Sequence, residues 1–132
     1  CNKESGVLGV SGVSNDNRDV AAAAEAGNER AKLAIDMQRY QILKFIGSYI
    51  AAMNGVDTIV FTGGIGENDA DLRKDICSRL TYLGLKLDDN ANNVRGEEIK
   101  ITTPDSAVNV YVIPTNEELK IARDTKAIVE AL

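Results

Sequence analysis

Two short segments of the sequence carry the residue types and spacing that ligand chemistry needs, Gly63–Asn68 and Pro114–Glu118. The first reads Gly-Gly-Ile-Gly-Glu-Asn, and glycine lets a ligand approach the main chain closely. It is no Walker A loop, because no Gly-Lys-Ser/Thr follows, and Asp69 stands at the third glycine position of a dinucleotide fingerprint. A tight turn with Asn68 or Asp69 as a helix cap explains the same residues equally well.

The charge of Glu67 limits which part of a ligand this segment could meet. A carboxylate there lies where a pyrophosphate would approach the start of the following helix, which disfavours a phosphate cradle. The segment therefore fits contact with a nucleoside, or with the inner phosphate edge, better than contact with outer phosphates.

The second segment has the spacing of a capping box. Thr115 is predicted to cap a helix while Glu118, three residues on, reaches back to the backbone N–H of Thr115. This assignment leaves Glu117 free to hold Mg²⁺, directly or through water. The pattern alone favours the alternative, a solvated glutamate that the helix dipole stabilises.

A third polar group, Asp16-Asn17-Arg18, opens a predicted helix through the alanines at 21–24 that ends at Gly27. Asp16 could accept from a ribose hydroxyl, and the Arg18 guanidinium could stack on an adenine. Capping by Asp16 or Asn17, with a surface ion pair, is the alternative that the pattern favours.

The elements around these segments alternate between helix and strand. Residues 1–17 are expected to be irregular, and Asn28–Asn54 to form a long helix with two apolar stripes that should be buried over much of its circumference. One stripe holds Leu33, Met37, Tyr40 and Leu43, and the other holds Ile35, Ile42, Ile46, Tyr49 and Met53. The apolar run 58–62 predicts a central parallel strand.

The second half of the chain continues the pattern. A helix with Leu72, Ile76, Leu80 and Leu83 inward should run to Gly84. A possible short strand (85–87), a polar loop (88–98), an edge strand (99–102), a core strand (108–113) and a last helix (116–128) follow. That last helix should turn Leu119, Ala122 and Ile128 inward. Cys77 is predicted to be a core thiol, and Arg73 and Lys74 to lie on a solvated face.

These elements predict an α/β fold whose sheet has a parallel core with helices packed on it. Ligands of such sheets bind beyond the carboxyl ends of the strands. The two strands that precede the candidate segments are expected to be neighbours, so that both segments border one crevice.

Composition excludes several classes of function. The 44% hydrophobic content is too high for a disordered tail, and the net charge of −5 disfavours a nucleic-acid duplex. No apolar run reaches the ~20 residues of a membrane span. The absence of histidine removes Ser/His/Asp and Cys/His nucleophiles. Two cysteines favour a reducing, cytoplasmic location. A start at Cys1 without Met or signal peptide indicates a piece of a longer protein.

Taken together, the motifs resemble the acetate kinase family, of the acetate and sugar kinase/Hsp70/actin superfamily. The resemblance covers essentially the whole chain, and the last third or so of the family's length. The segments that carry it are Ser5–Ser14 with Asp16-Asn17-Arg18, Val60–Asn68, and Val112–Leu119.

The resemblance implies a ribonuclease H-like (actin-like ATPase) fold with a mixed sheet, residues 1–132 being the C-terminal fragment of the nucleotide-binding domain. It implies ATP or ADP contacts from Asp16, Asn17, Arg18, Gly64, Ile65, Gly66, Glu67 and Asn68, and a Mg²⁺ contact from Glu117. The implied parent is a homodimer that converts ATP and acetate to ADP and acetyl phosphate.

The family's catalytic residues lie upstream, so none is expected in this fragment, which is predicted to be inactive alone. Three alternatives stay open. They are a propionate kinase of the same family, a non-catalytic nucleotide-binding or oligomerisation module, and, more weakly, a piece of a Rossmann domain.

Overall fold

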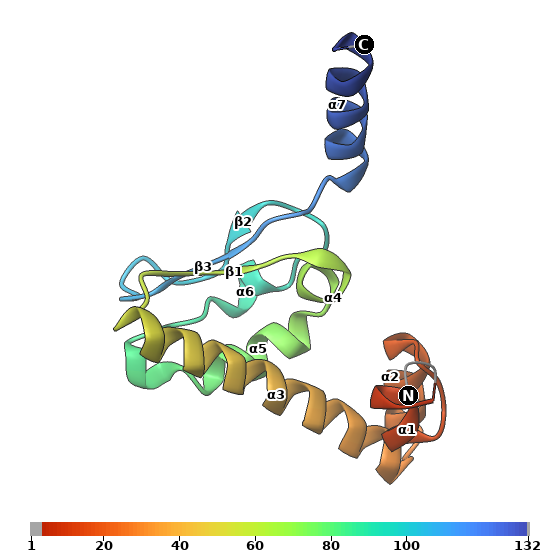
Figure 1. Ribbon diagram of the computed structural model, residues 1–132. Helices are drawn as coiled ribbons and strands as arrows, with labels where there is room; N and C mark the ends of the chain where they lie inside the picture. Colours follow the sequence, from red (N-terminus) through yellow and green to blue (C-terminus); the bar gives the residue numbers. More distant parts are fainter. Residues whose placement is uncertain (1–3, 132) are drawn as a thin grey trace. The chain divides into compact units, whose positions relative to one another are not determined.

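The computed structural model describes residues 4–131 (Figure 1). These residues form two compact units, which divide between Gly55 and Val56.

The first unit is helical and consists of α1 (Gly6–Ser11), α2 (Asn17–Glu25) and α3 (Glu29–Met53). Its buried core is Val20, Ala31 and Ala34. The helix α1 contradicts the prediction that residues 1–17 are irregular; residues 1–3 lie outside the described part. Glycine and valine form helices poorly, but Val7 and Val10 pack against this core and so stabilise the helical turn.

Side chains cap the starts of the two longer helices, and the predicted cap at Asp16 is confirmed. The Asp16 side chain accepts from the backbone N–H of Arg18, and the Asn28 side chain accepts from the N–H groups of Arg30 and Ala31. Helix α3 ends where Asn54 adopts a left-handed conformation (φ 59°). The caps satisfy N–H groups that a helix start leaves without intrahelical partners.

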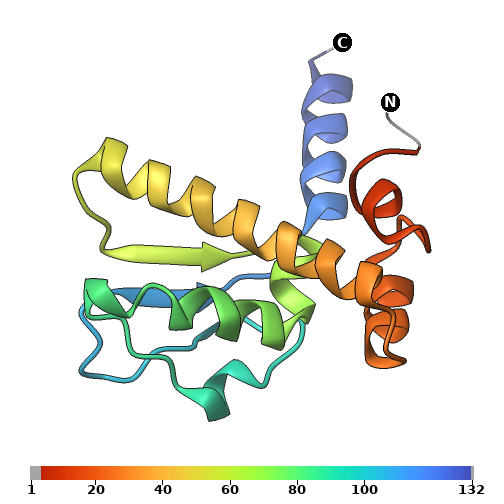
Figure 2. The ribbon, with the colours of Figure 1, turned by 90° about the horizontal axis from the view of Figure 1, so that it is seen from below.

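The expected burial around α3 is wrong. Only Ala31 and Ala34 are fully buried on this helix, because α1 and α2 gather at its N-terminal end (Figures 1 and 2). Large apolar side chains farther along stay exposed, among them Met37, Tyr40 and Tyr49. No helix of residues 4–131, this 25-residue one included, is long and apolar enough to cross a membrane.

The second unit is built on a three-stranded mixed sheet, which confirms the predicted α/β class. Strand β3 (Asn109–Val112) lies between β1 (Thr58–Phe61), its parallel neighbour, and β2 (Ile99–Lys100), its antiparallel neighbour. The prediction that the 58–62 strand is central is wrong, because within the described residues β1 pairs with β3 alone. The predicted edge position of the 99–102 strand is confirmed.

Helices α4 (Gly63–Asn68), α5 (Ala70–Ser78) and α6 (Asp89–Asn92) follow β1, and α5 lies along one face of the sheet (Figures 1 and 2). The predicted helix to Gly84 is too long, because α5 ends at Ser78 and the 3₁₀ turn η1 (Thr81–Leu83) replaces its last turn. Residues 85–87 make one isolated bridge, from Leu87 to Thr102, rather than a strand. The buried core of this unit is Phe61, Leu72, Ile76, Cys77, Leu80, Leu85, Ile101, Val108, Val110 and Val112.

The last helix, α7 (Glu117–Glu130), has no buried residue. Its predicted inward side is therefore wrong: Leu119, Ala122 and Ile128 are all exposed. The apolar spacing is present, but no described element covers it.

Candidate functional site

The two candidate segments meet at one edge of the sheet. They follow β1 and β3, which are parallel neighbours, so both leave the same edge. The backbone N–H of Ile113 donates to the Phe61 carbonyl at 3.0 Å. Beyond it, Glu67 Oε1 accepts from the backbone N–H and from the hydroxyl of Thr115, each at 2.9 Å. The predicted neighbourhood of the two segments is thus confirmed.

The glycine-rich segment is a short helix, α4, rather than an open loop. Gly63 begins it at a φ of +70°, a conformation that favours glycine. Asn68 Nδ2 donates to the Gly64 carbonyl at 2.8 Å, and the Asp69 side chain caps α5 by accepting from Leu72 N–H at 2.8 Å. The expected helix cap at Asp69 is confirmed, and Asn68 acts within α4 itself.

The glycines of α4 differ in the space around them. A Cβ at Gly64 would meet nothing within 4 Å, whereas one at Gly66 would lie 3.2 Å from the Phe61 carbonyl carbon. Packing thus disfavours a side chain at position 66, while Gly64 leaves the main chain open to a ligand. The Ile65 side chain between them is 39% exposed and offers an apolar surface.

The predicted capping box is wrong. Asn116, not Thr115, caps α7 by accepting from Leu119 N–H at 3.0 Å. Thr115 instead donates hydrogen bonds from its N–H and its hydroxyl to the Glu67 carboxylate. Hydrogen bonds to an ionised acceptor are stronger than hydrogen bonds to a neutral one. Glu117 and Glu118 both lie exposed in the first turn of α7, and neither side chain has a hydrogen bond or ion pair within residues 4–131.

The Glu67 carboxylate is held in its charged form. The two Thr115 donors, with the Gly63 N–H adding a smaller effect, lower the pKa of Glu67 below its usual value. A fixed negative charge therefore lies at the junction of the two segments. The prediction that the junction suits a nucleoside better than outer phosphates depends on this charge and stays a prediction.

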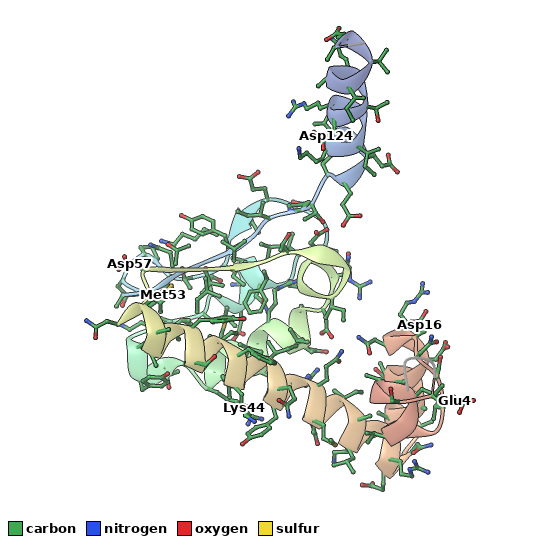
Figure 3. All side chains as sticks on the ribbon, in the orientation of Figure 1. Glu4, Asp16, Lys44, Met53, Asp57 and Asp124 are labelled. Atoms are coloured by element: carbon green, nitrogen blue, oxygen red, sulfur yellow. The ribbon has the colours of Figure 1, made fainter. Side chains whose placement is uncertain are left out.

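The Asp16–Arg18 group lies at the start of α2 in the first unit, where Figure 3 labels Asp16. Arg18 pairs with Asp16 at 2.6 Å between Nη2 and Oδ2, which lowers the pKa of Asp16 to about 2. The structure thus has the capping and surface ion pair that the pattern favoured. The Arg18 side chain is 90% exposed, so its guanidinium face remains open.

Sequence analysis missed Arg73, which it placed on a solvated face. The side chain is fully buried, while Lys74 is exposed as predicted. The sequence does carry a signal that Arg73 is buried. Arg73 lies three and four residues before Ile76 and Cys77, and residues at that spacing lie on the same side of a helix. Cys77 is a core thiol, as predicted, and burial raises its pKa to about 12.

No group of three or more His, Cys, Asp or Glu side chains within residues 4–131 could hold a metal by itself. Any metal bound by this part of the chain would need ligands from elsewhere. For Mg²⁺ this is ordinary, since it commonly binds one or two carboxylates together with waters and substrate phosphates.

Comparison with known proteins gives consistent matches. The model of the Acetokinase family matches residues 1–123. The chain is 60% identical over 129 residues to an acetate kinase of Methanosarcina barkeri, and 57% identical over 130 residues to one of Halothermothrix orenii. Each match covers 98% of this chain, but 32% and 33% of the relatives, so the chain spans about a third of their length.

Solved structures agree with the sequence matches. The crystal structure of Porphyromonas gingivalis acetate kinase matches 97% of this chain and 32% of its own, with a TM-score of 0.88 and 50% identity. A propionate kinase from Francisella tularensis matches 92% of this chain and 30% of its own, with a TM-score of 0.79 and 46% identity.

Proposed function

The chain belongs to the acetokinase family, and from this membership we propose that it supplies part of the nucleotide site of a phosphotransferase. The proposed enzyme converts ATP and acetate to ADP and acetyl phosphate. Residues 1–132 would be the C-terminal part of its nucleotide-binding domain.

The observation that carries this proposal is the pair of hydrogen bonds from Thr115 to Glu67. They join the two motifs of the family resemblance at the carboxyl edge of parallel strands, where α/β sheets bind ligands. Neither motif alone is specific for a nucleotide site, so the proposal depends on the two motifs lying next to each other in this fold.

The nucleotide contacts are proposed residue by residue. The open main chain at Gly64 and the exposed Ile65 would meet the adenosine, with Gly66, Glu67 and Asn68 shaping that surface. In the first unit, Asp16, Asn17 and Arg18 would also contact the nucleotide. The accessible guanidinium of Arg18 suits stacking on a base.

Glu117 is the proposed Mg²⁺ residue. Its carboxylate is exposed and unpaired within the described residues, which fits a cation held mainly by nucleotide phosphates and water. A divalent ion there would neutralise charge on the phosphate oxygens during transfer. Glu117 itself would only hold and orient the ion.

The chain by itself is proposed to be inactive, since phosphoryl transfer depends on groups around the transferred phosphate and no catalytic residue is assigned here. A propionate kinase is the second candidate activity, favoured by the likeness to a solved propionate kinase. A non-catalytic nucleotide-binding or oligomerisation module is the third, favoured by the exposed apolar side chains of α3.

The same apolar side chains support a homodimer as the proposed assembly. The net charge of −5 argues against a nucleic-acid partner. A cytoplasmic location without membrane contact is proposed, and the free thiol of Cys77 supports it.

Calorimetric titration of the full-length protein with Mg·ADP tests the nucleotide proposal. Gly64→Ala should weaken binding by about tenfold or more, equivalent to ~1.4 kcal/mol, because a methyl group blocks approach to the main chain. The matched control is Gly47→Ala in α3, where a Cβ also meets nothing within 4 Å. Equal affinity in both variants, or no binding by the folded wild type, would overturn the proposal.

A further inference from the structure

We propose that Arg73 is the positioning residue of the candidate nucleotide site, holding α4 in its binding shape by tying it to residues 92–94. The effect of Arg73 on nucleotide binding rests on the proposed function. The tie between α4 and residues 92–94 rests on the geometry of the second unit alone. The side chain comes from α5 and is fully buried.

The Arg73 guanidinium uses all five of its N–H groups. Nη1 donates to the carbonyls of Gly66 and Glu67 at 2.9 and 3.0 Å. Nε and Nη2 donate to the side chain and the carbonyl of Asn92 at 2.9 and 2.7 Å, and Nη2 also donates to the Val94 carbonyl at 2.8 Å. One planar group therefore joins the end of α4 to the end of α6.

The acceptors are all uncharged. Within residues 4–131 Arg73 makes no ion pair at contact distance, and its buried charge is surrounded by four main-chain carbonyls and one amide oxygen, with a longer-range attraction from the Asp69 carboxylate. Burying a charge is unfavourable unless it is fully hydrogen-bonded, which explains why a planar five-donor group occupies this place. Lysine has three donors and cannot reproduce the fork.

The two contacts to α4 lie on the motif residues that the proposal uses. With the carbonyls of Gly66 and Glu67 fixed inward, the Glu67 side chain reaches Thr115 and Gly64 stays open. Asn92 closes the arrangement by donating from Nδ2 to the Ala70 carbonyl at 2.9 Å. Loss of the guanidinium would remove its hydrogen bonds to the carbonyls of Gly66 and Val94, while the Glu67 and Asn92 carbonyls would keep only the N–H groups of Gly96 and Val94. Both segments should therefore loosen together.

Hydrogen exchange of the full-length protein without nucleotide tests the mechanism. In Arg73→Lys, exchange should accelerate about tenfold or more in residues 63–68 and 92–96, while β3 keeps its wild-type protection. The matched control is Lys74→Met, which removes the neighbouring exposed cation and its ion pair with Asp89. A uniform loss of protection, or no loss in either segment, would overturn the inference.

Asn92→Ala is the second variant for the same hydrogen-exchange test, used if Arg73→Lys does not fold. It keeps Arg73 and its four main-chain acceptors and removes the Asn92 side chain, which accepts from Arg73 Nε and donates to the Ala70 carbonyl. The same two segments should therefore loosen by a smaller factor. Wild-type protection in both segments of Asn92→Ala would count against the tie.

The functional readout separates positioning from general stability. In Arg73→Lys the KM for ATP should rise about tenfold, whereas the KM for acetate should stay unchanged. Equal increases in both would assign Arg73 a merely structural role. If the wild type bound no nucleotide, the proposed function would fail, and hydrogen exchange alone would still decide whether Arg73 ties the two segments.

Discussion

Glu67 Oε1 accepts two hydrogen bonds from Thr115, a residue 48 positions later in the chain. This relationship makes one site of two motifs that are distant in sequence. It also gives Glu67 a task other than ligand binding, since its negative charge is engaged across the junction. The glycine motif can therefore contain a carboxylate and still border a nucleotide, provided that the outer phosphates lie elsewhere.

Thr115→Val should raise the pKa of Glu67 toward its ordinary value of 4.5, because it removes the hydroxyl donor and keeps the main-chain one. A lowered folded pKa adds stability above the ordinary value, and that stability is lost as the pH falls through the folded pKa. Carboxyl NMR titration measures the shift. An unchanged Glu67 pKa in Thr115→Val would show that the hydroxyl contributes nothing in solution.

Asp16 should titrate at about 2 in the folded protein, and Arg18→Ala should move its pKa up toward 3.8. The side-chain hydrogen bonds from Arg18 are the main cause, followed by the backbone N–H of Arg18. As for Glu67, the lowered pKa of Asp16 stabilises the folded state. This contribution is complete above about pH 4 and is lost as the pH falls toward 2. The same midpoint in wild type and Arg18→Ala would contradict the ion pair.

Gly66→Ala should destabilise the protein, whereas Gly64→Ala should not. A Cβ at position 66 presses on the Phe61 main chain, which pairs with Val112 and cannot easily move. Overpacking costs ~1–3 kcal/mol, against a gain of ~1 kcal/mol in helix propensity. Urea unfolding measures the difference, and equal midpoints for the two variants would refute the packing argument.

Glu117→Gln should weaken ADP binding about tenfold when Mg²⁺ is present and leave it unchanged in EDTA. Glu118→Gln is the matched control, because it removes the same charge from the same helical turn and so has the same effect on the helix dipole. Calorimetry with and without Mg²⁺ separates the cases. A loss shared equally by both variants would mean that Glu117 holds no metal.

Local features of the chain were predictable from the sequence. The apolar runs at β1 and β3 and the caps Asp16 and Asp69 depend on neighbouring residues, and all four are found as predicted. The family resemblance drawn from the motifs is also confirmed.

The features that failed depend on contacts between distant residues. Thr115 was expected to cap its own helix, but its partner is Glu67. Helix α1 forms because Val7 and Val10 find a core in later helices, against their local propensity. Arg73 looked solvated by type, and only its position beside Ile76 and Cys77 on the buried stripe indicated otherwise.

The central claim is that nucleotide binds where the glycine motif meets the Pro114–Glu118 segment. The most direct measurement is hydrogen exchange of the full-length protein with and without saturating Mg·ADP. We predict slower exchange in residues 62–68 and 114–118, with the segment 99–103 unchanged as an internal reference. Saturated binding that slows exchange only outside both segments, or no binding at all, would contradict the claim.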